Sequence, residues 1–284
     1  MSSLTDTAPP QAASRRVRPR WGTLLHRLFV VLMYAFVLCP LVFVVWLSFF
    51  QDPIMIFPPS GYTVSWYANA WGNAAFVNGF LTSLQVALMA AVGGVVLGVL
   101  ASLGIVRHRF KGGKTVNTLL LSPLLVPGIV AGVAIYLFYL AVENIVDADI
   151  VGTYGGLVVA HVCLTIPWTV RLVSASMAGL DPSIEEAARN LGASGRVAFL
   201  RITLPMLRPA IVAAALFSFV VSFENLEFSL SLVGPGRTTL PIAIMQYLEF
   251  NLDPTIAAVA TLQILLLGIV MFVTDRYVKL SQVV

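Results

Sequence analysis

Charged residues are scarce in this sequence. Asp, Glu, Lys and Arg make up 11% of its 284 residues, whereas soluble domains contain about 25%. Apolar residues make up 58% and the mean hydropathy is +0.91, which excludes a soluble core with a charged surface. In lipid, only helices and closed barrels satisfy the backbone hydrogen bonds. The apolar runs are long and continuous, without the alternation of barrel strands, and therefore predict an all-α membrane protein.

Residues that could carry out catalysis are also few. Both cysteines, Cys39 and Cys163, fall inside apolar runs and are interpreted as small buried hydrophobic side chains rather than disulfide partners or reactive thiols. Among the scattered histidines only His161 lies inside a predicted membrane segment. A hydrogen bond between helices is the favoured role for it, and a proton relay is the alternative. Without a clustered nucleophile, base or metal set, we expect a chain that is not an enzyme.

A phosphate-binding loop is missing as well. Residues 108–115 end in Gly113-Lys114-Thr115, but His108 stands where the first glycine of such a loop belongs, and the segment follows an apolar run instead of a strand. It is interpreted as a basic turn. We therefore expect that this chain binds no cofactor and does not hydrolyse ATP itself.

Six apolar segments have the length of about 20 residues that crosses a ~30 Å hydrocarbon layer. They cover residues 28–50, 79–105, 116–141, 154–176, 210–232 and 256–274. Pro123, Pro127 and Pro167 interrupt the third and fourth segments. Proline is tolerated in membrane helices where neighbouring groups re-satisfy the freed backbone atoms, so six spanning helices are predicted.

Glycines at four-residue spacing occur in two of these segments. They form the pairs Gly94/Gly98 and Gly128/Gly132. This spacing allows helix backbones to approach closely, and we interpret both pairs as packing sites.

The basic residues predict the orientation. Every Lys and Arg except Arg237 falls in the N-terminal tail, in the connection after the second segment, in or around the connection after the fourth segment, or at the C-terminus. By the positive-inside rule, both termini are expected in the cytoplasm. Residues 1–27 are then a basic cytoplasmic tail, and 28–284 form a transmembrane domain whose first helix is too long for a signal peptide. Because membrane topology explains the excess of basic over acidic residues, a nucleic-acid partner is not expected.

The first outer connection, residues 51–78, is rich in aromatic residues. An aromatic belt at the membrane interface explains this composition. Residues 65–71 can alternatively form a short surface helix for an extracytoplasmic partner. Both interpretations remain open at this point.

The cytoplasmic segment 177–209 has the pattern of a helical hairpin. Asp181 and Pro182 favour a helix start, and Gly192 favours its end because glycine adopts a left-handed conformation. A second amphipathic stretch follows and leads into the fifth span. Small exposed side chains on such a hairpin favour docking into a groove of another protein.

This segment resembles the EAA loop of binding-protein-dependent ABC importer permeases. The pattern is E-A-A, three residues, G, nine residues, I-x-L-P, and the sequence keeps every spacing from Glu186 to Pro205. The resemblance implies a type I importer fold in the bacterial inner membrane and a coupling helix that contacts an ATPase. The residues expected to contact that ATPase are Glu185, Glu186, Ala187, Ala188, Gly192, Ile202, Leu204 and Pro205.

The same resemblance implies partners. They are a second permease subunit of different sequence, two cytoplasmic ATPase subunits that bind ATP and Mg²⁺, and an extracytoplasmic substrate-binding protein. Membrane lipid surrounds the complex.

The fifth segment carries carboxylates, which are costly in lipid and point to function. If 216–231 is wound as one helix, serines and Asn225 form one polar stripe, while Glu224 and Glu227 lie on another. Glu227 has an alternative role as a merely solvated residue at the outer interface. The predicted substrate path consists of Glu224, Asn225, Glu227, Ser218, Ser222, Phe217 and Phe228.

Residues 234–241, Gly-Pro-Gly-Arg-Thr-Thr-Leu-Pro, together with the acidic turn at Glu224 and Asn225, resemble the spermidine/putrescine permeases. In many of those permeases a second acid stands at the position of Asn225. The resemblance implies a small organic cation such as a polyamine as substrate, and iron(III) and thiamine are alternatives because their permeases are similar. A different class, an ion-gradient-driven transporter using Glu224 and Glu227, is disfavoured because it has no ATPase for the EAA loop to contact.

Overall fold

The computed structural model describes residues 20–54, 56–108 and 110–278, and these residues are almost entirely helical. The basic residues Arg15, Arg16, Arg18, Arg109 and Lys279, on which part of the predicted orientation rests, lie outside this range. So do residues 1–19 of the predicted tail.

Apart from the long connection 48–64 between α1 and α2, the helices follow one another with short connections, and the apolar runs form the longest helices. In chain order they are α1 (Arg20–Leu47), α2 (Ser65–Gly72), α3 (Ala74–Arg107), α4 (Gly113–Leu121), the 3₁₀ helix η1 (Ser122–Leu125), α5 (Gly128–Val146), α6 (Tyr154–Ala178), α7 (Pro182–Asn190), α8 (Gly195–Ala198), the π-helical turn η2 (Phe199–Thr203), α9 (Leu204–Phe223), α10 (Glu227–Leu232), α11 (Leu240–Leu248) and α12 (Thr255–Val278).

Within the described residues, six helices are long and apolar enough to cross a membrane, as predicted. The second, fourth and sixth lie close to their predicted bounds. Pro167 does not interrupt the fourth, because α6 continues through it. The first helix begins earlier than predicted and ends at Leu47.

Two predicted segments have the wrong bounds. The third spanning helix is α5, which starts at Gly128, because Pro127 has an extended backbone that separates α5 from α4 and η1. The fifth runs from Gly195 to Phe223 and ends nine residues before the predicted end at 232. The chain leaves the helix there and starts again as α10.

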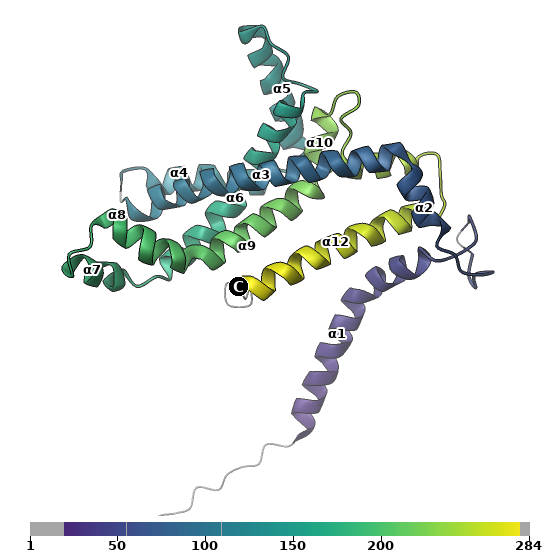
Figure 1. The fold of residues 1–284 in the computed structure, drawn as a ribbon, viewed down its shortest axis with the longest axis horizontal. Coiled ribbons are helices and arrows are strands. Elements are labelled where there is room, and N and C mark those ends of the chain that lie inside the picture. Colours follow the sequence, from purple (N-terminus) through teal and green to yellow (C-terminus); the bar gives the residue numbers. More distant parts are fainter. Residues whose placement is uncertain (1–19, 55, 109, 279–284) are drawn as a thin grey trace, which may run out of the picture.

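The core of the bundle is the contact among α3, α6 and α9, which lie side by side (Figure 1). The glycine pair on α3 makes this contact close, since a Cβ on Gly98 would lie 2.5 Å from Cβ of Thr169 on α6. Gly132 on α5 similarly faces the backbone of Phe228 on α10. The packing role predicted for both pairs is confirmed.

The periphery is apolar and exposed. Helix α1 stands away from the bundle (Figure 1), and its apolar side chains contact little of the chain, as expected of a helix facing lipid or another subunit. Cys39 on α1 and Cys163 on α6 are free, but they are exposed. Their predicted burial is therefore wrong, because both lie on outward faces of their helices.

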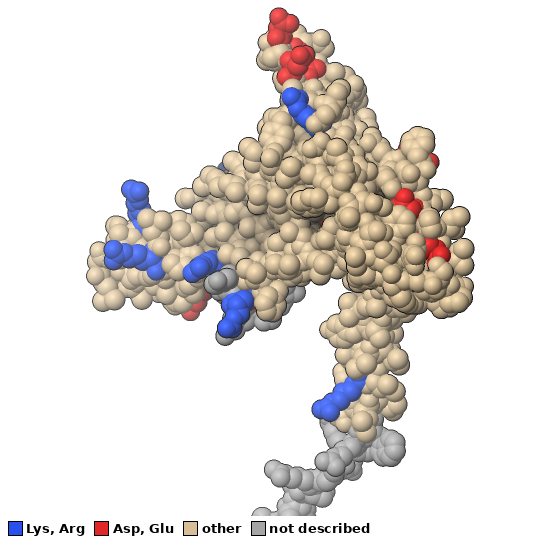
Figure 2. Space-filling view, turned by 45° about the vertical axis from the view of Figure 1, so that its right-hand side comes forward, with Lys and Arg blue, Asp and Glu red and all other residues tan. Residues whose placement is uncertain are grey.

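Charge separates along the molecule. Figure 2 shows Lys and Arg side chains mainly over the end that carries α4, α7 and α8, whereas Asp and Glu gather at the tip of α5 and at the opposite end. A short surface helix, α2, forms at that opposite end as one of the two interpretations predicted. It is fixed by Trp66, whose indole N–H donates to the Phe50 carbonyl at 2.6 Å.

Candidate coupling loop and substrate path

The connection between α6 and α9 folds as the predicted helical hairpin. The backbone N–H of Ser183 donates to the Asp181 carboxylate at 2.9 Å, and Pro182 occupies the first turn of α7. This backbone hydrogen bond also lowers the pKa of Asp181. Gly192 ends the helix with φ +90°, and Ser194 caps α8. These are local signals, which explains why the sequence predicts them.

The outer face of this hairpin is exposed. Glu186, Ala187 and Gly192 are accessible, and the side chain of Leu191 is 91% exposed. Ala188 is half-buried. A nearly fully exposed leucine beside small residues makes an apolar tip at the end of the bundle.

The base of the hairpin is less accessible. Ile202 and Leu204 are half-buried where η2 joins α9, and Pro205 is exposed. The predicted ATPase-contacting residues therefore divide into an exposed tip and a base that joins the tip to the fifth spanning helix.

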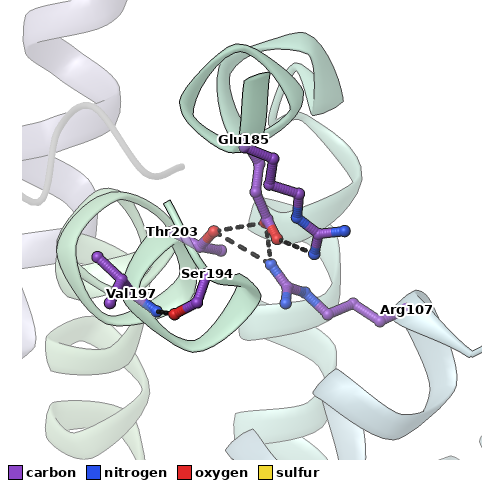
Figure 3. Close-up of polar contacts among 6 residues, drawn as sticks. Arg107, Glu185, Ser194, Val197 and Thr203 are labelled. Carbon is purple, nitrogen blue, oxygen red and sulfur yellow. Dashed lines mark hydrogen bonds and ion pairs between the residues drawn. The ribbon is translucent and has the colours of Figure 1, made fainter. Parts of the chain in front are cut away.

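Glu185 differs from the other predicted contacts because it turns toward the chain itself. Its carboxylate pairs with Arg107 at the end of α3 (Figure 3). It also pairs, at 2.8 Å, with Arg189 one turn along α7. The hydroxyl of Thr203 in η2 donates to the same carboxylate at 2.8 Å. Partial burial acts to raise the pKa of Glu185, but Thr203 and the two guanidinium groups outweigh it, so the pKa lies below its usual value.

The predicted substrate path is broken at its centre. Glu224 follows the last residue of α9, and the backbone is not helical again until Glu227. The side-chain oxygen of Asn225 accepts from the backbone N–H of Phe228, in the first turn of α10, at 2.8 Å. The single polar helix assumed for 216–231 is therefore wrong, because the chain changes direction between the two carboxylates.

His161 lies at this break. Its Nδ1 is 2.8 Å from the hydroxyl of Ser222 on α9, and its Nε2 is 3.2 Å from the hydroxyl of Ser229 on α10. All three side chains are buried. The hydrogen-bonding role favoured for His161 matches this geometry, and one imidazole connects α6 to both sides of the break.

The other predicted path residues lie in different surroundings. Ser218 is buried with its hydroxyl 3.4 Å from that of Thr169, and Phe228 is buried in the core. Phe217 is 43% exposed and stacks on Trp168. The structure does not bring these three side chains together with the carboxylates.

The carboxylates of Glu224 and Glu227 also lie apart from each other, beside different helices. Glu227 is exposed and packs beside Gly128 on α5, whereas Glu224 accepts from the side-chain amide of Gln263 on α12 at 3.4 Å. Gln263 lies in an apolar run, and nothing in its spacing pointed to this contact. Among the described residues, no group of three or more His, Cys, Asp or Glu side chains is arranged to hold a metal ion.

Comparison with known proteins agrees with the hairpin and the bundle. Residues 94–280 match the model of the family described as binding-protein-dependent transport system inner membrane component. The chain is 30% identical over 258 residues to the putrescine transport system permease protein PotI of Escherichia coli strain K12, covering 90% of both chains. It is 27% identical to the spermidine/putrescine transport system permease protein PotC of Haemophilus influenzae, covering 85% of this chain and 91% of the relative.

Solved structures share the fold. A bacterial ABC transporter involved in the import of the acidic polysaccharide alginate matches with a TM-score of 0.69 at 14% identity, over 92% of this chain and 98% of that one. The MetNI methionine ABC transporter matches with a TM-score of 0.60 at 19% identity, over 75% of this chain and 97% of that one. Together with the family match, these likenesses confirm the type I importer permease fold that the resemblance to the EAA loop implied. Because the family model matches most of its length, the chain belongs to the family of inner membrane components of binding-protein-dependent transport systems.

Proposed function

We propose that this permease forms one half of the membrane pathway of an ATP-driven polyamine importer and binds a cytoplasmic ATPase through α7. The observation that carries the proposal is the exposed tip formed by Glu186, Ala187, Leu191 and Gly192. Burial of a leucine side chain contributes about 1.5–3 kcal/mol, so Leu191 favours a partner groove. The small alanine lets that groove approach the helix closely.

The remaining partners follow from the membership in the family. A second permease of different sequence completes the pathway, two ATPase subunits bind ATP and Mg²⁺, and an extracytoplasmic protein delivers the substrate. This chain binds no cofactor in this scheme. The basic end of the molecule faces the cytoplasm, since basic loops remain on that side, and both termini lie there.

The proposed substrate is a polyamine. Relatives over most of the chain are named for putrescine and spermidine. Glu224 stands at the break between α9 and α10, where the backbone leaves the helix and its exposed carboxylate is accessible to an ammonium group, while the side-chain oxygen of Asn225 is held by α10. An exposed carboxylate at this position suits a cation better than an anion.

Co-purification tests the ATPase contact. A Gly192→Val or Glu186→Lys variant should insert into the membrane but retain little of the ATPase that the wild-type complex retains. Glu249→Lys provides a matched control, because it makes the same charge change on an exposed residue at the other end of the molecule. If both variants retain the ATPase like the wild type and transport normally, α7 is not the contact.

Uptake into proteoliposomes tests the substrate. The complex, assembled with its second permease, binding protein and ATPase, should take up radiolabelled putrescine or spermidine only when ATP is supplied to the ATPase. Uptake of thiamine or iron(III) instead would contradict the polyamine assignment. Uptake driven by an ion gradient without the ATPase would contradict the importer class.

A further inference from the structure

Arg107, the last residue of α3, contacts three residues of the hairpin that connects α6 to α9. We propose that Arg107 is a positioning residue that transmits the movement of α7 to α3. This role rests on the proposed contact between α7 and an ATPase, and it specifies the route by which that contact acts on the membrane helices.

The contacts of Arg107 form a closed network (Figure 3). Its Nη2 pairs with the Glu185 carboxylate on α7 and donates to the Thr203 hydroxyl on η2 at 3.1 Å, while Thr203 donates onward to Glu185. The guanidinium carbon also lies 5.0 Å from the centre of the Phe199 ring, on η2 as well. One side chain therefore contacts the hairpin before and after its turn at Gly192.

A groove separates the backbones that this network joins. Its volume is about 470 Å³, and it lies between the end of α3, the start of α7 and η2. Its walls include Val106, His108, Pro182, Ile184, Ile202 and Met206. Helix α7 packs on α8 and η2, whereas Arg107 reaches it from α3 across the groove. Movement of α7 can therefore reach α3 through this side chain.

The far end of α3 is placed to use such movement. The helix has 34 residues, roughly 51 Å at 1.5 Å per residue, and packs along α6 and α9. Near its other end, the hydroxyl of Ser83 accepts from the backbone N–H of Leu240 at the start of α11 at 2.9 Å. A displacement at Arg107 is thus carried by a continuous helix to the outer part of the bundle.

Arginine suits this position for a chemical reason. The planar guanidinium can pair with a carboxylate, donate to a hydroxyl and stack on an aromatic ring at the same time, and it stays charged. The Glu185 and Arg107 side chains are only 18% and 29% exposed, so water screens this pair less than an open surface pair. A lysine at 107 keeps the charge but cannot make all three contacts from one flat group.

The test compares Arg107→Gln with Lys111→Gln, which removes an exposed basic residue of the following turn that takes part in neither ion pair of Glu185. In the complete complex, Arg107→Gln should retain the ATPase and its ATP hydrolysis but lower putrescine uptake per ATP at least fivefold. Lys111→Gln should match the wild type. Loss of ATPase retention in the hairpin-tip variants tests the proposed function separately, because Arg107 lies behind the tip.

Exchanging the charges at positions 107 and 185 tests whether a restored ion pair also restores transport. Arg189 would repel an arginine at 185, so the exchange is made in an Arg189→Ala background, where Arg107→Glu and Glu185→Arg should each lower uptake per ATP. The two together should recover most of what either loses. Failure of the exchange to recover uptake, with both single variants impaired, would show that the ion pair itself is not the link.

A readout without substrate completes the test. With Cys39 and Cys163 replaced by serine, a spin label at Leu81→Cys, a 46% exposed position in the outer part of α3, reports on that end of the helix. A non-hydrolysable ATP analogue should change its mobility in the otherwise unaltered complex and not in Arg107→Gln. An equal change in both would overturn the proposal, whichever substrate the complex carries.

Discussion

The Nδ1 atom of His161 on α6 lies 2.8 Å from the hydroxyl oxygen of Ser222 in the last turn of α9. Since Nε2 of the same ring contacts Ser229 on α10, this histidine connects the two sides of the helix break. The ring is 1% exposed, so no solvent replaces these partners. The segment proposed to line the substrate path therefore depends on a buried side chain that is not itself exposed.

Replacement of His161 by leucine should destabilise the permease. It removes two hydrogen bonds between helices, each of which contributes about 0.6–2 kcal/mol in a membrane protein, and leaves two buried hydroxyl groups without this partner. Thermal unfolding of the detergent-purified protein, followed by tryptophan fluorescence, measures the effect. Cys163→Ala, an exposed change on the same helix, should leave the midpoint unchanged, and an equal midpoint for His161→Leu would contradict the prediction.

A side chain at Gly98 should separate α3 from α6. The added Cβ of Gly98→Ala meets two side-chain carbons of Thr169 at 2.5 and 2.6 Å, so the helices must shift. Overpacking of this kind costs about 1–3 kcal/mol. Gly104→Ala is the matched control on the same helix, since its Cβ meets nothing within 4 Å, and it should be neutral or slightly stabilising. Equal unfolding midpoints for the two variants would show that α3 and α6 do not pack in this way.

The position of α7 should depend on pH only under acid conditions. The pKa of Glu185 is lower in the folded protein than its usual value of 4.5. The stabilisation from its ionised form is therefore complete above that usual value and is lost as the pH falls through the lowered folded pKa. A spin label at Leu191→Cys should keep constant mobility from neutral pH down to about pH 5 and become more mobile below the folded pKa. A Glu185→Gln variant should lose the part of this transition that comes from Glu185 and keep the part that comes from the Asp181 cap, whose pKa is also lowered. A transition near neutral pH would point to another group.

Replacement of Glu224 by glutamine should weaken polyamine uptake. A charge pair at a water-accessible site contributes about 1 kcal/mol, so we expect a rise in KM of about fivefold with a smaller change in kcat. Glutamine retains an oxygen that can accept from Gln263, which limits structural effects. The comparison variant is Glu227→Gln, which removes the charge of the exposed carboxylate beside α5. An unchanged KM for Glu224→Gln would assign Glu224 to the contact with α12 instead of to the substrate.

The hairpin of the coupling loop could be predicted because its determinants are local. Asp181, Pro182 and Gly192 each act on the backbone within a few residues, and the structure uses all three as expected. The direction of Glu185 could not be predicted in the same way. Its partner Arg107 lies 78 residues earlier in the sequence. Only the packing of α3 beside the hairpin brings the two charges together.

The break after Phe223 shows a different limit. The run of serines, aromatics and acids fits a helical period, and neither proline nor glycine marks an end there. The break is instead held by tertiary and side-chain contacts: Asn225 accepts from the first turn of α10, and His161 holds Ser222 and Ser229 from a separate helix. At Pro127 the local signal was present in the sequence, but the prediction allowed the helix to continue through it, whereas the extended backbone at that residue ends the connection to α4.

The length of α3 has a consequence for the lipid around the protein. At roughly 51 Å, it exceeds a hydrocarbon layer of about 30 Å, so the helix tilts or extends beyond the bilayer, and Arg107 then lies on the aqueous side of the inner surface. A thicker bilayer reduces this hydrophobic mismatch and with it the need for the helix to tilt, whereas a thinner one increases it. The efficiency of transport should therefore vary with the acyl-chain length of the surrounding phospholipids.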